Sequence, residues 1–100
     1  MGLCIIGARD IEDYQKYKNA VLLDLRSPEE FRYFHIPGAV NVPQERLEQY
    51  MKEVSQRQIV IFYCQHGSLS FREGKHYARE GYQICTLTGG VVAYRRVFGV

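Results

Sequence analysis

One cysteine of this sequence stands where a strand is expected to give way to a helix. Cys64 follows the most apolar stretch of the chain, Ile59 to Tyr63, and precedes a helix expected from Ser70. A thiol in such a turn faces backbone N–H groups and the positive end of the helix dipole, and both favour the thiolate over the thiol. Residues 64–70 therefore predict a site for an anion or a nucleophile.

Strand-like and helix-like stretches alternate along the chain. The expected strands are 3–6, 21–25, 39–42, 58–63 and 83–87, and the expected helices are 11–18, 28–34, 45–54, 70–81 and 91–98. Such alternation is typical of an α/β fold, with a mostly parallel central sheet and helices on both faces. Ligands of these sheets bind beyond the carboxyl ends of the strands, which is where Cys64 is expected.

Single residues predict where several helices begin and end. Ser27, Pro28 and Glu30 form a capping box with proline at the first helical position. Asp10 is expected to cap the first helix, and Gly81 to end the helix that follows Cys64. The residues expected to face the core from that later helix are Phe71, Tyr77 and Ala78.

Length and composition predict one domain, residues 1–100. The chain is 46% hydrophobic and 13% aromatic, which is enough to close a single core. Its 13 lysines and arginines against 11 acidic residues give a net charge of +2 that is spread along the sequence. A nucleic-acid-binding protein has a dense basic stripe instead, so no nucleic-acid partner is expected.

The cysteines and the apolar runs predict the compartment. The three cysteines, Cys4, Cys64 and Cys85, are an odd count, and the start lacks the basic and apolar regions of a signal peptide. Free thiols in a reducing compartment are expected. No apolar run approaches the roughly 20 residues of a membrane span, so we expect a soluble, cytoplasmic protein without a membrane partner.

Four short motifs are distributed over nearly the whole chain. They are residues 23–26 with 29–31; residues 35–39 with Asn41 and Pro43; residues 64–70 after an apolar strand; and residues 87–90. Each motif is weak alone, but their order and spacing together resemble the single-domain rhodaneses, a family of sulfurtransferase-type modules. The resemblance implies a single rhodanese-like α/β domain.

The resemblance also implies a reaction. The loop cysteine, Cys64, attacks the outer sulfur of thiosulfate, sulfite leaves, and the resulting persulfide passes its sulfur to cyanide or to a thiol. Backbone N–H groups of residues 65–70 would cradle the anion, with Gly67 allowing the tight curvature that a Cβ resists. The substrate-binding residues implied are Gln65, His66, Gly67, Ser68, Leu69, Ser70 and Arg72. The implied partners are a small anionic sulfur donor and a thiol or cyanide acceptor; a sulfur-relay protein is also compatible, and no cofactor or metal is expected.

Four charged or titratable residues around this site each have two interpretations. His66 either stabilises a bound anion or only fills the loop, and Arg72 either binds an anionic substrate or is a solvated surface charge. Asp24 and Arg26 either form an ion pair that orients the loop or a purely structural pair. His35 belongs to a turn motif and is expected to be structural.

Cys64 and the other two cysteines are interpreted differently. An inert, buried thiol at the end of a strand is the alternative for Cys64. Cys4 and Cys85 fall in apolar strand runs, where a packing role is expected. A resolving role for Cys85, with a disulfide to Cys64, is the alternative for that residue, because neighbouring strands lie only about 5 Å apart.

Two loop positions depart from the family pattern. Gln65 and Leu69 stand where thiosulfate-active members often carry a cationic or hydroxyl side chain, so the loop itself contributes no fixed cation. Loss of one charge-assisted contact, worth roughly 1.5–3 kcal/mol, weakens the binding of a dianion about ten- to a hundredfold. This favours a persulfide carrier or a weak thiosulfate enzyme.

Two other functions compete with sulfur transfer. A cysteine-dependent phosphatase of the related dual-specificity type needs an arginine six positions after the cysteine to clamp phosphate, and Ser70 stands there. A non-catalytic rhodanese-like module that binds a protein or senses an oxyanion is the second alternative. The presence of Cys64 argues against it, because degenerate modules commonly lose the nucleophile.

Overall fold

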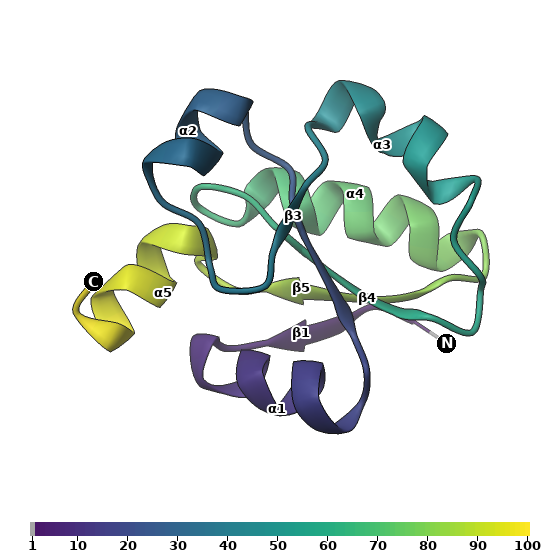
Figure 1. Ribbon diagram of the computed structural model, residues 1–100. Coiled ribbons are helices and arrows are strands. Elements are labelled where there is room, and N and C mark those ends of the chain that lie inside the picture. The colour runs from purple at the N-terminus through teal and green to yellow at the C-terminus, as the bar shows by residue number, and fades with distance from the viewer. Residues whose placement is uncertain (1) are drawn as a thin grey trace.

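The computed structural model describes residues 2–100. Met1, which belongs to the expected single domain, lies outside the described residues. The strands are β1 (Cys4–Ile6), β2 (Val21–Asp24), β3 (Val40–Asn41), β4 (Ile59–Tyr63) and β5 (Gln83–Leu87). The helices are the short 3-10 helix η1 (Ala8–Asp10) and α1 (Ile11–Tyr17), α2 (Pro28–Tyr33), α3 (Gln44–Met51), α4 (Ser68–Arg79) and α5 (Gly90–Phe98) (Figure 1).

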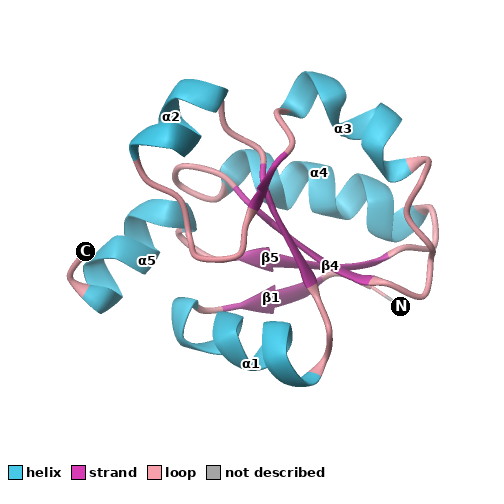
Figure 2. Cartoon of the chain, viewed as in Figure 1, coloured by secondary structure: helices cyan, strands magenta, loops and turns pink. Residues whose placement is uncertain are grey.

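The five strands form one sheet in the order β1-β5-β4-β2-β3, and every pair of neighbours is parallel. Parallel strands need crossover connections, which the helices supply. All strands therefore present their carboxyl ends at one edge of the sheet; the arrowheads of β1 and β5 point toward α5 (Figure 2). The expected α/β architecture is confirmed, and the sheet is wholly rather than mostly parallel.

Alternate residues of the central strands pack into two cores, one on each face of the sheet. Leu22 of β2 and Ile61 of β4 join the core that contains Ile11 of α1 and Val91 of α5. The next residues along the two strands turn the other way, into the core built against α3 and α4. Figure 1 shows α3 and α4 above the sheet and α1 below it. Both faces are thus covered, which explains why the strands read as continuous apolar runs.

Two expectations about helix beginnings have opposite outcomes. The capping box of α2 is confirmed: the N–H of Glu30 donates to Ser27 Oγ at 3.2 Å, and the N–H of Ser27 donates to Glu30 Oε1 at 3.2 Å. The cap expected from Asp10 is wrong, because its carboxylate accepts from the N–H of Gly7 at 2.9 Å instead. Asp10 therefore closes the 3-10 turn before α1 and does not cap α1 itself.

The helix after Cys64 differs from the expectation at its start and on its inner face. It begins at Ser68, two residues early, because Gly67 takes a left-handed conformation (φ 108°) at the N-cap. Its buried residues are Ser70, Gly74 and Tyr77, a stripe of helical spacing. Phe71 lies one position off this stripe and is 39% exposed, so the prediction that it faces the core is wrong.

No helix within residues 2–100 is both long enough and apolar enough to cross a bilayer.

Candidate active site

The expected site residues meet at the carboxyl edge of the sheet. Cys64 directly follows β4, and Arg26 lies just beyond β2, the strand paired with β4. Because neighbouring parallel strands end side by side, residues nearly 40 positions apart in the sequence become neighbours here. Arg26 contacts Gln65 directly, through a hydrogen bond of 3.3 Å from Nη1 to Oε1.

The sulfur of Cys64 lies in a cradle of backbone donors. The N–H of Gly67 donates to Sγ at 3.2 Å and the N–H of Ser70 at 3.3 Å. The thiol itself donates to Ser70 Oγ at 3.6 Å, and that hydroxyl donates to the carbonyl of Gly67 at 3.2 Å. Two N–H dipoles aimed at one sulfur stabilise negative charge on it, and a rotated Ser70 hydroxyl can add a third donor.

The cradle is closed from behind by the turn between β5 and α5. The N–H of Val91 donates to the carbonyl of Cys64 at 2.9 Å, and the N–H of Val92 donates to the carbonyl of Gln65 at 3.2 Å. A Cβ on Gly90 (φ +64°) would lie 2.5 Å from the Gln65 carbonyl oxygen and 2.6 Å from that of Cys64. The carbonyls of the loop are thereby held away from the sulfur, and only Gly fits at position 90.

Asp24 and Arg26 form a buried ion pair that supports the loop. Arg26 Nη2 lies 2.8 Å from Asp24 Oδ2, and Asp24 is fully buried while Arg26 is 8% exposed. Burial opposes the charge of Arg26, but the hydrogen bonds and negative charge of Asp24 outweigh it and raise the pKa of the guanidinium. Arg26 also donates to the carbonyl of Phe34 and to Gln65. One guanidinium thus joins β2, the segment after α2 and the cysteine loop.

The aromatic ring of Tyr63, the last residue of β4, supports this pair from below. The guanidinium of Arg26 lies 5.8 Å from the ring centroid. The Tyr63 hydroxyl accepts from the N–H of Ile36 at 3.1 Å. Burial raises the pKa of the Tyr63 phenol far above its usual value, so it stays neutral. Tyr63 therefore adds no negative charge to that of Asp24.

A cavity of about 370 Å³ opens beside Cys64. The residues of the loop that line it are Cys64, Gln65, His66, Ser68 and Leu69. Ser70 is fully buried behind the sulfur, and Gly67 contributes its N–H. Arg72 is exposed and is not among the lining residues, so the structure does not bring this expected anion-binding residue to the cavity.

Residues that sequence reasoning did not assign to the site line the other side of the same cavity. They include Ser27 and Glu30 at the start of α2, and Pro43, Gln44 and Glu45 at the start of α3. These segments follow β2 and β3, whose carboxyl ends lie at the same edge as that of β4. The rule that parallel strands end together was the signal that could have found them.

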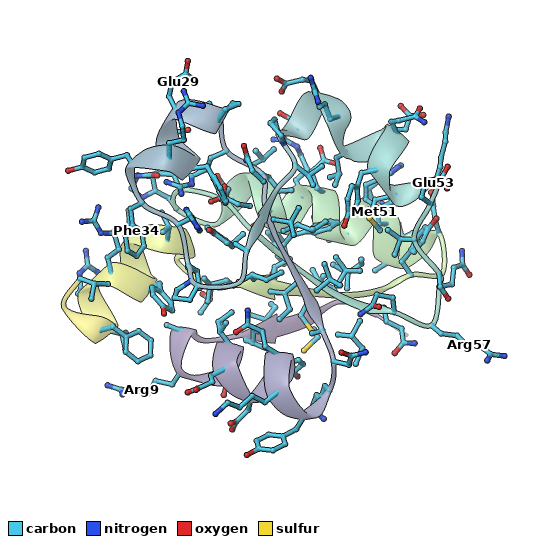
Figure 3. All side chains as sticks on the ribbon, in the orientation of Figure 1. Arg9, Glu29, Phe34, Met51, Glu53 and Arg57 are labelled. Carbon is cyan, nitrogen blue, oxygen red and sulfur yellow. The ribbon has the colours of Figure 1, made fainter. Side chains whose placement is uncertain are left out.

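His35 and Phe34 lie in the turn that follows α2. The His35 ring stacks on Phe31, with 3.8 Å between centroids, and its Nδ1 lies 2.9 Å from the Phe31 carbonyl oxygen. This is the structural role expected for His35. Phe34 lies beneath the guanidinium of Arg95, 4.7 Å from it. Figure 3 places Phe34 beside α5.

Cys4 and Cys85 lie away from the loop, inside the sheet. They are partners in the register of β1 and β5, and Cys85 is also level with Ile61 of β4. Cys64 is three residues beyond Ile61, about 10 Å further along the strand direction. A disulfide requires Cα atoms within about 7 Å, so a resolving role for Cys85 does not fit this fold.

Within residues 2–100 no cluster of three or more histidine, cysteine or acidic side chains has the geometry of a metal site. The chemistry available at the carboxyl edge is that of a thiol, oriented backbone N–H groups and a paired guanidinium. This arrangement can hold a nucleophilic sulfur and a small anion, and the titratable side chains of His66, Glu30 and Glu45 line the same cavity.

Comparison with known proteins identifies the family. Residues 7–96 match the rhodanese-like domain model, so the chain belongs to the rhodanese-like domain family. Over 80 residues the chain is 29% identical to a protein of Allochromatium vinosum named sulfurtransferase, covering 79% of this chain and 75% of that protein. It is 37% identical over 75 residues to the uncharacterized protein YqhL of Bacillus subtilis, covering 74% of this chain and 60% of that one.

The fold is also seen in solved structures. The crystal structure of reduced Bacillus anthracis CoADR-RHD superposes with a TM-score of 0.87 at 23% identity. The match covers 97% of this chain but only 17% of that much longer one. At this identity the likeness concerns the fold alone, in agreement with the five-stranded parallel sheet described above.

Proposed function

We propose that this chain is a sulfurtransferase in which Cys64 carries sulfane sulfur as a persulfide from a donor to a thiol or cyanide acceptor. The observation that carries the proposal is the pair of N–H groups, from Gly67 and Ser70, that point at Cys64 Sγ within 3.3 Å at the wall of a cavity. The family and a distant relative named sulfurtransferase support it.

The reaction proceeds in two displacements at sulfur. The Cys64 thiolate attacks the outer sulfur of a donor such as thiosulfate; a new S–S bond forms, the donor's S–S bond breaks, and sulfite leaves with the bonding electrons. An acceptor thiolate or cyanide then attacks the terminal sulfur of the Cys64 persulfide and regenerates the thiolate. The number of electrons balances in each step, so no external oxidant or reductant is needed.

The residues around Cys64 have separate roles in this proposal. The N–H groups of the loop stabilise first the thiolate and then the persulfide anion, because both place negative charge in the same cradle. Ser68 and Leu69 begin α4, where the first N–H groups of a helix have no partner within the helix and can bind the leaving oxyanion. Arg26 positions the loop through Gln65.

The structure around Ser70 favours this function over phosphate transfer. Ser70 occupies the position that an arginine takes in the phosphatases, and its N–H and hydroxyl both face the sulfur. Ser70 is fully buried and cannot supply the bidentate guanidinium clamp that a phosphate needs from this position.

Intact-mass measurement tests the proposal. The full chain is incubated with thiosulfate, and separately with an organic persulfide, and then analysed with and without a thiol acceptor. We expect a gain of one sulfur atom that disappears on addition of acceptor, that is absent in Cys64→Ser, and that persists in Cys85→Ser. If the wild-type chain gains no Cys64-dependent sulfur from either donor, the proposal is wrong and a non-catalytic binding module becomes the better explanation.

A further inference from the structure

We infer that two carboxylates at the mouth of the Cys64 cavity, Glu30 and Glu45, select the sulfur donor by its charge. They favour a donor that carries at most one negative charge, such as an organic persulfide or a thiosulfonate, over the dianion thiosulfate. The inference rests on the proposed function, since it concerns which donor loads Cys64.

The first step of the argument is the balance of charge around the cavity. Apart from Cys64, the titratable side chains that line it are Arg26, His66, Glu30 and Glu45. The guanidinium of Arg26 is already paired with buried Asp24 at 2.8 Å, so its charge is compensated. The charge of Glu30 also contributes to the raised pKa of that guanidinium, so Glu30 lies within its electrostatic range. The single positive charge of Arg26 therefore stands against three carboxylates, those of Asp24, Glu30 and Glu45, and the wall of the cavity is negative.

The second step concerns how firmly these carboxylates are held. Glu30 Oε1 accepts from both the N–H and the hydroxyl of Ser27, each at 3.2 Å. The capping box thus holds the carboxylate at the start of α2, beside the cavity. Glu45 lies in the first turn of α3, where a negative charge interacts favourably with the helix dipole. Both carboxylates thus belong to the N-terminal turns of helices that line the cavity.

The third step concerns the positive charges on the lining. Among residues 2–100, Arg26 is the only arginine or lysine that lines the cavity. Arg72, which the sequence offered as an anion-binding residue, is exposed and is not among the lining residues of this cavity. The backbone N–H groups of the loop attract any anion to the sulfur, whereas the carboxylates repel it in proportion to its charge. The repulsion from the two carboxylates therefore reduces the binding free energy of a dianion by twice as much as that of a monoanion.

Two donors of similar shape but different charge separate this effect from all others. Thiosulfate carries two negative charges and methanethiosulfonate carries one. In both reactions the Cys64 thiolate attacks the terminal sulfur, a Cys64 S–S bond forms and the donor's S–S bond breaks. Sulfite leaves in the first case and methanesulfinate in the second, each with the bonding electrons. The bond formed and the bond broken at sulfur are of the same kind in both reactions, and the difference between the leaving groups is the same in wild type and variant. A change in the ratio of the two rates between wild type and variant therefore reports the charge of the two carboxylates.

The variants are Glu30→Gln, Glu45→Gln and the double variant. Gln at position 30 keeps the capping box because it can accept the same hydrogen bonds. The control is Glu53→Gln, which removes one negative charge from the chain at an exposed position outside the cavity lining. In Figure 3 Glu53 lies past the end of α3, on the side away from α2.

We expect the double variant to raise kcat/KM for methanethiosulfonate about two- to fivefold and that for thiosulfate by about the square of the same factor. The increase should fade at about 0.5 M salt, where screening shortens the range of the charges to a few ångströms. Thermal unfolding of each variant checks that the fold is unchanged, and Glu53→Gln should leave the donor ratio within about 1.5-fold of wild type.

Each outcome of these experiments either supports or overturns the inference. A donor ratio that is unchanged in the double variant, or that changes as much in Glu53→Gln, overturns the inference while the proposed function stands, because both donors still load Cys64. If the wild-type chain is loaded by neither donor nor by an organic persulfide, the proposed function fails and the inference fails with it. A salt-dependent rise that follows the square relation supports the role of the two carboxylates.

Discussion

Cys64 and Cys85 are equally hidden from solvent but have opposite surroundings. Cys64 is 5% exposed and Cys85 is 4% exposed; Cys64 directly follows β4, and Cys85 lies in the neighbouring strand β5. The sulfur of Cys64 faces two backbone N–H groups and a hydroxyl. Cys85 lies among apolar side chains, with the thiol of Cys4 and the hydroxyl of Tyr14 as its polar neighbours. Exposure therefore does not distinguish these thiols, but the local field does.

The difference follows from position along a strand. Within a strand the N–H groups are used in the ladder, as they are around Cys85, which pairs on both sides with β1 and β4. One residue beyond a strand, the chain turns, and its N–H groups become free to point at a side chain. Burial penalises a thiolate, and burial together with the neighbouring Cys4 thiol raises the pKa of Cys85 to about 12. The same burial around Cys64 is accompanied by donors that stabilise the charge.

The largest expected effect is the difference between Cys64 and Cys85 in their rates of alkylation by iodoacetamide at pH 7.5. With a pKa of about 12, Cys85 holds almost no thiolate at that pH, whereas Cys64 has two N–H donors on its sulfur. We expect Cys64 to be labelled at least about a hundredfold faster than Cys85. Peptide mapping by mass spectrometry after timed quenching gives both rates in one sample. Equal rates would mean that the loop does not activate its thiol.

Substitution of Gly90 tests whether the turn behind the loop maintains the cradle. The Cβ of Gly90→Ala would lie 2.5 Å from the Gln65 carbonyl oxygen at a left-handed φ of +64°, so the loop must shift. We expect a loss of about 2 kcal/mol in the free energy of unfolding, together with a slower alkylation of Cys64 and no change for Cys85.

Gly99→Ala is the matched control for that variant. Gly99 has a similar φ of +68°, but nothing lies within 4 Å of an added Cβ. It should lose only the conformational cost of about 1 kcal/mol and leave both cysteines unchanged. Urea unfolding measures the two free energies. Equal losses in Gly90→Ala and Gly99→Ala would show that the contact with the loop carbonyls is unimportant.

The smallest effect that we expect is the loss of stability between pH 9 and 10 that comes from the Cys85 region, which amounts to about 1 kcal/mol. The raised pKa of Cys85 means that the folded chain keeps its proton above pH 9, where the unfolded chain releases it. Stability from this group is thus complete below about pH 9 and falls as pH rises toward 12, by at most about 1.4 kcal/mol per pH unit.

The Cys85→Ser variant isolates that contribution. The pKa values of Tyr14 and Tyr63 are also raised, the first mainly by its hydrogen bond to Cys4 and the second by burial, and these phenols add a further loss above about pH 10. Between pH 9 and 10, Cys85→Ser should therefore remove most of the slope, while Cys64→Ser should keep it. Urea unfolding at several pH values measures the slopes; an unchanged slope in Cys85→Ser contradicts the assignment.

Local patterns predicted much of the fold. The run from Ile59 to Tyr63 and the capping box at Ser27 were enough to place β4 and α2, because apolar periodicity and cap chemistry act over a few residues. The cap expected from Asp10 failed because a 3-10 turn competed for the same carboxylate. The prediction that Phe71 faces the core is wrong, because α4 begins early, at Ser68, and Phe71 lies beside its buried stripe.

The site residues, too, could be predicted where they are contiguous in the sequence and were missed where they are not. Cys64 and its loop could be recognised from sequence, since the motif is continuous and its glycine, serines and following helix are contiguous. Arg26 was recognised as a neighbour, but its hydrogen bond to Gln65 was not foreseen. The cavity wall formed by Glu30 and Glu45 was missed entirely, and Arg72 was assigned to a site that it does not line.

The sequence by itself determined the class of fold and the residue on which the proposed chemistry depends, because both follow from short, contiguous patterns. Only the tertiary structure decided which charges surround that residue. Charges act through space, and the carboxylates of α2 and α3 reach Cys64 only because three parallel strands end at one edge of the sheet. The thiol could therefore be identified from the sequence, whereas the charge of its cavity could be identified only from the fold.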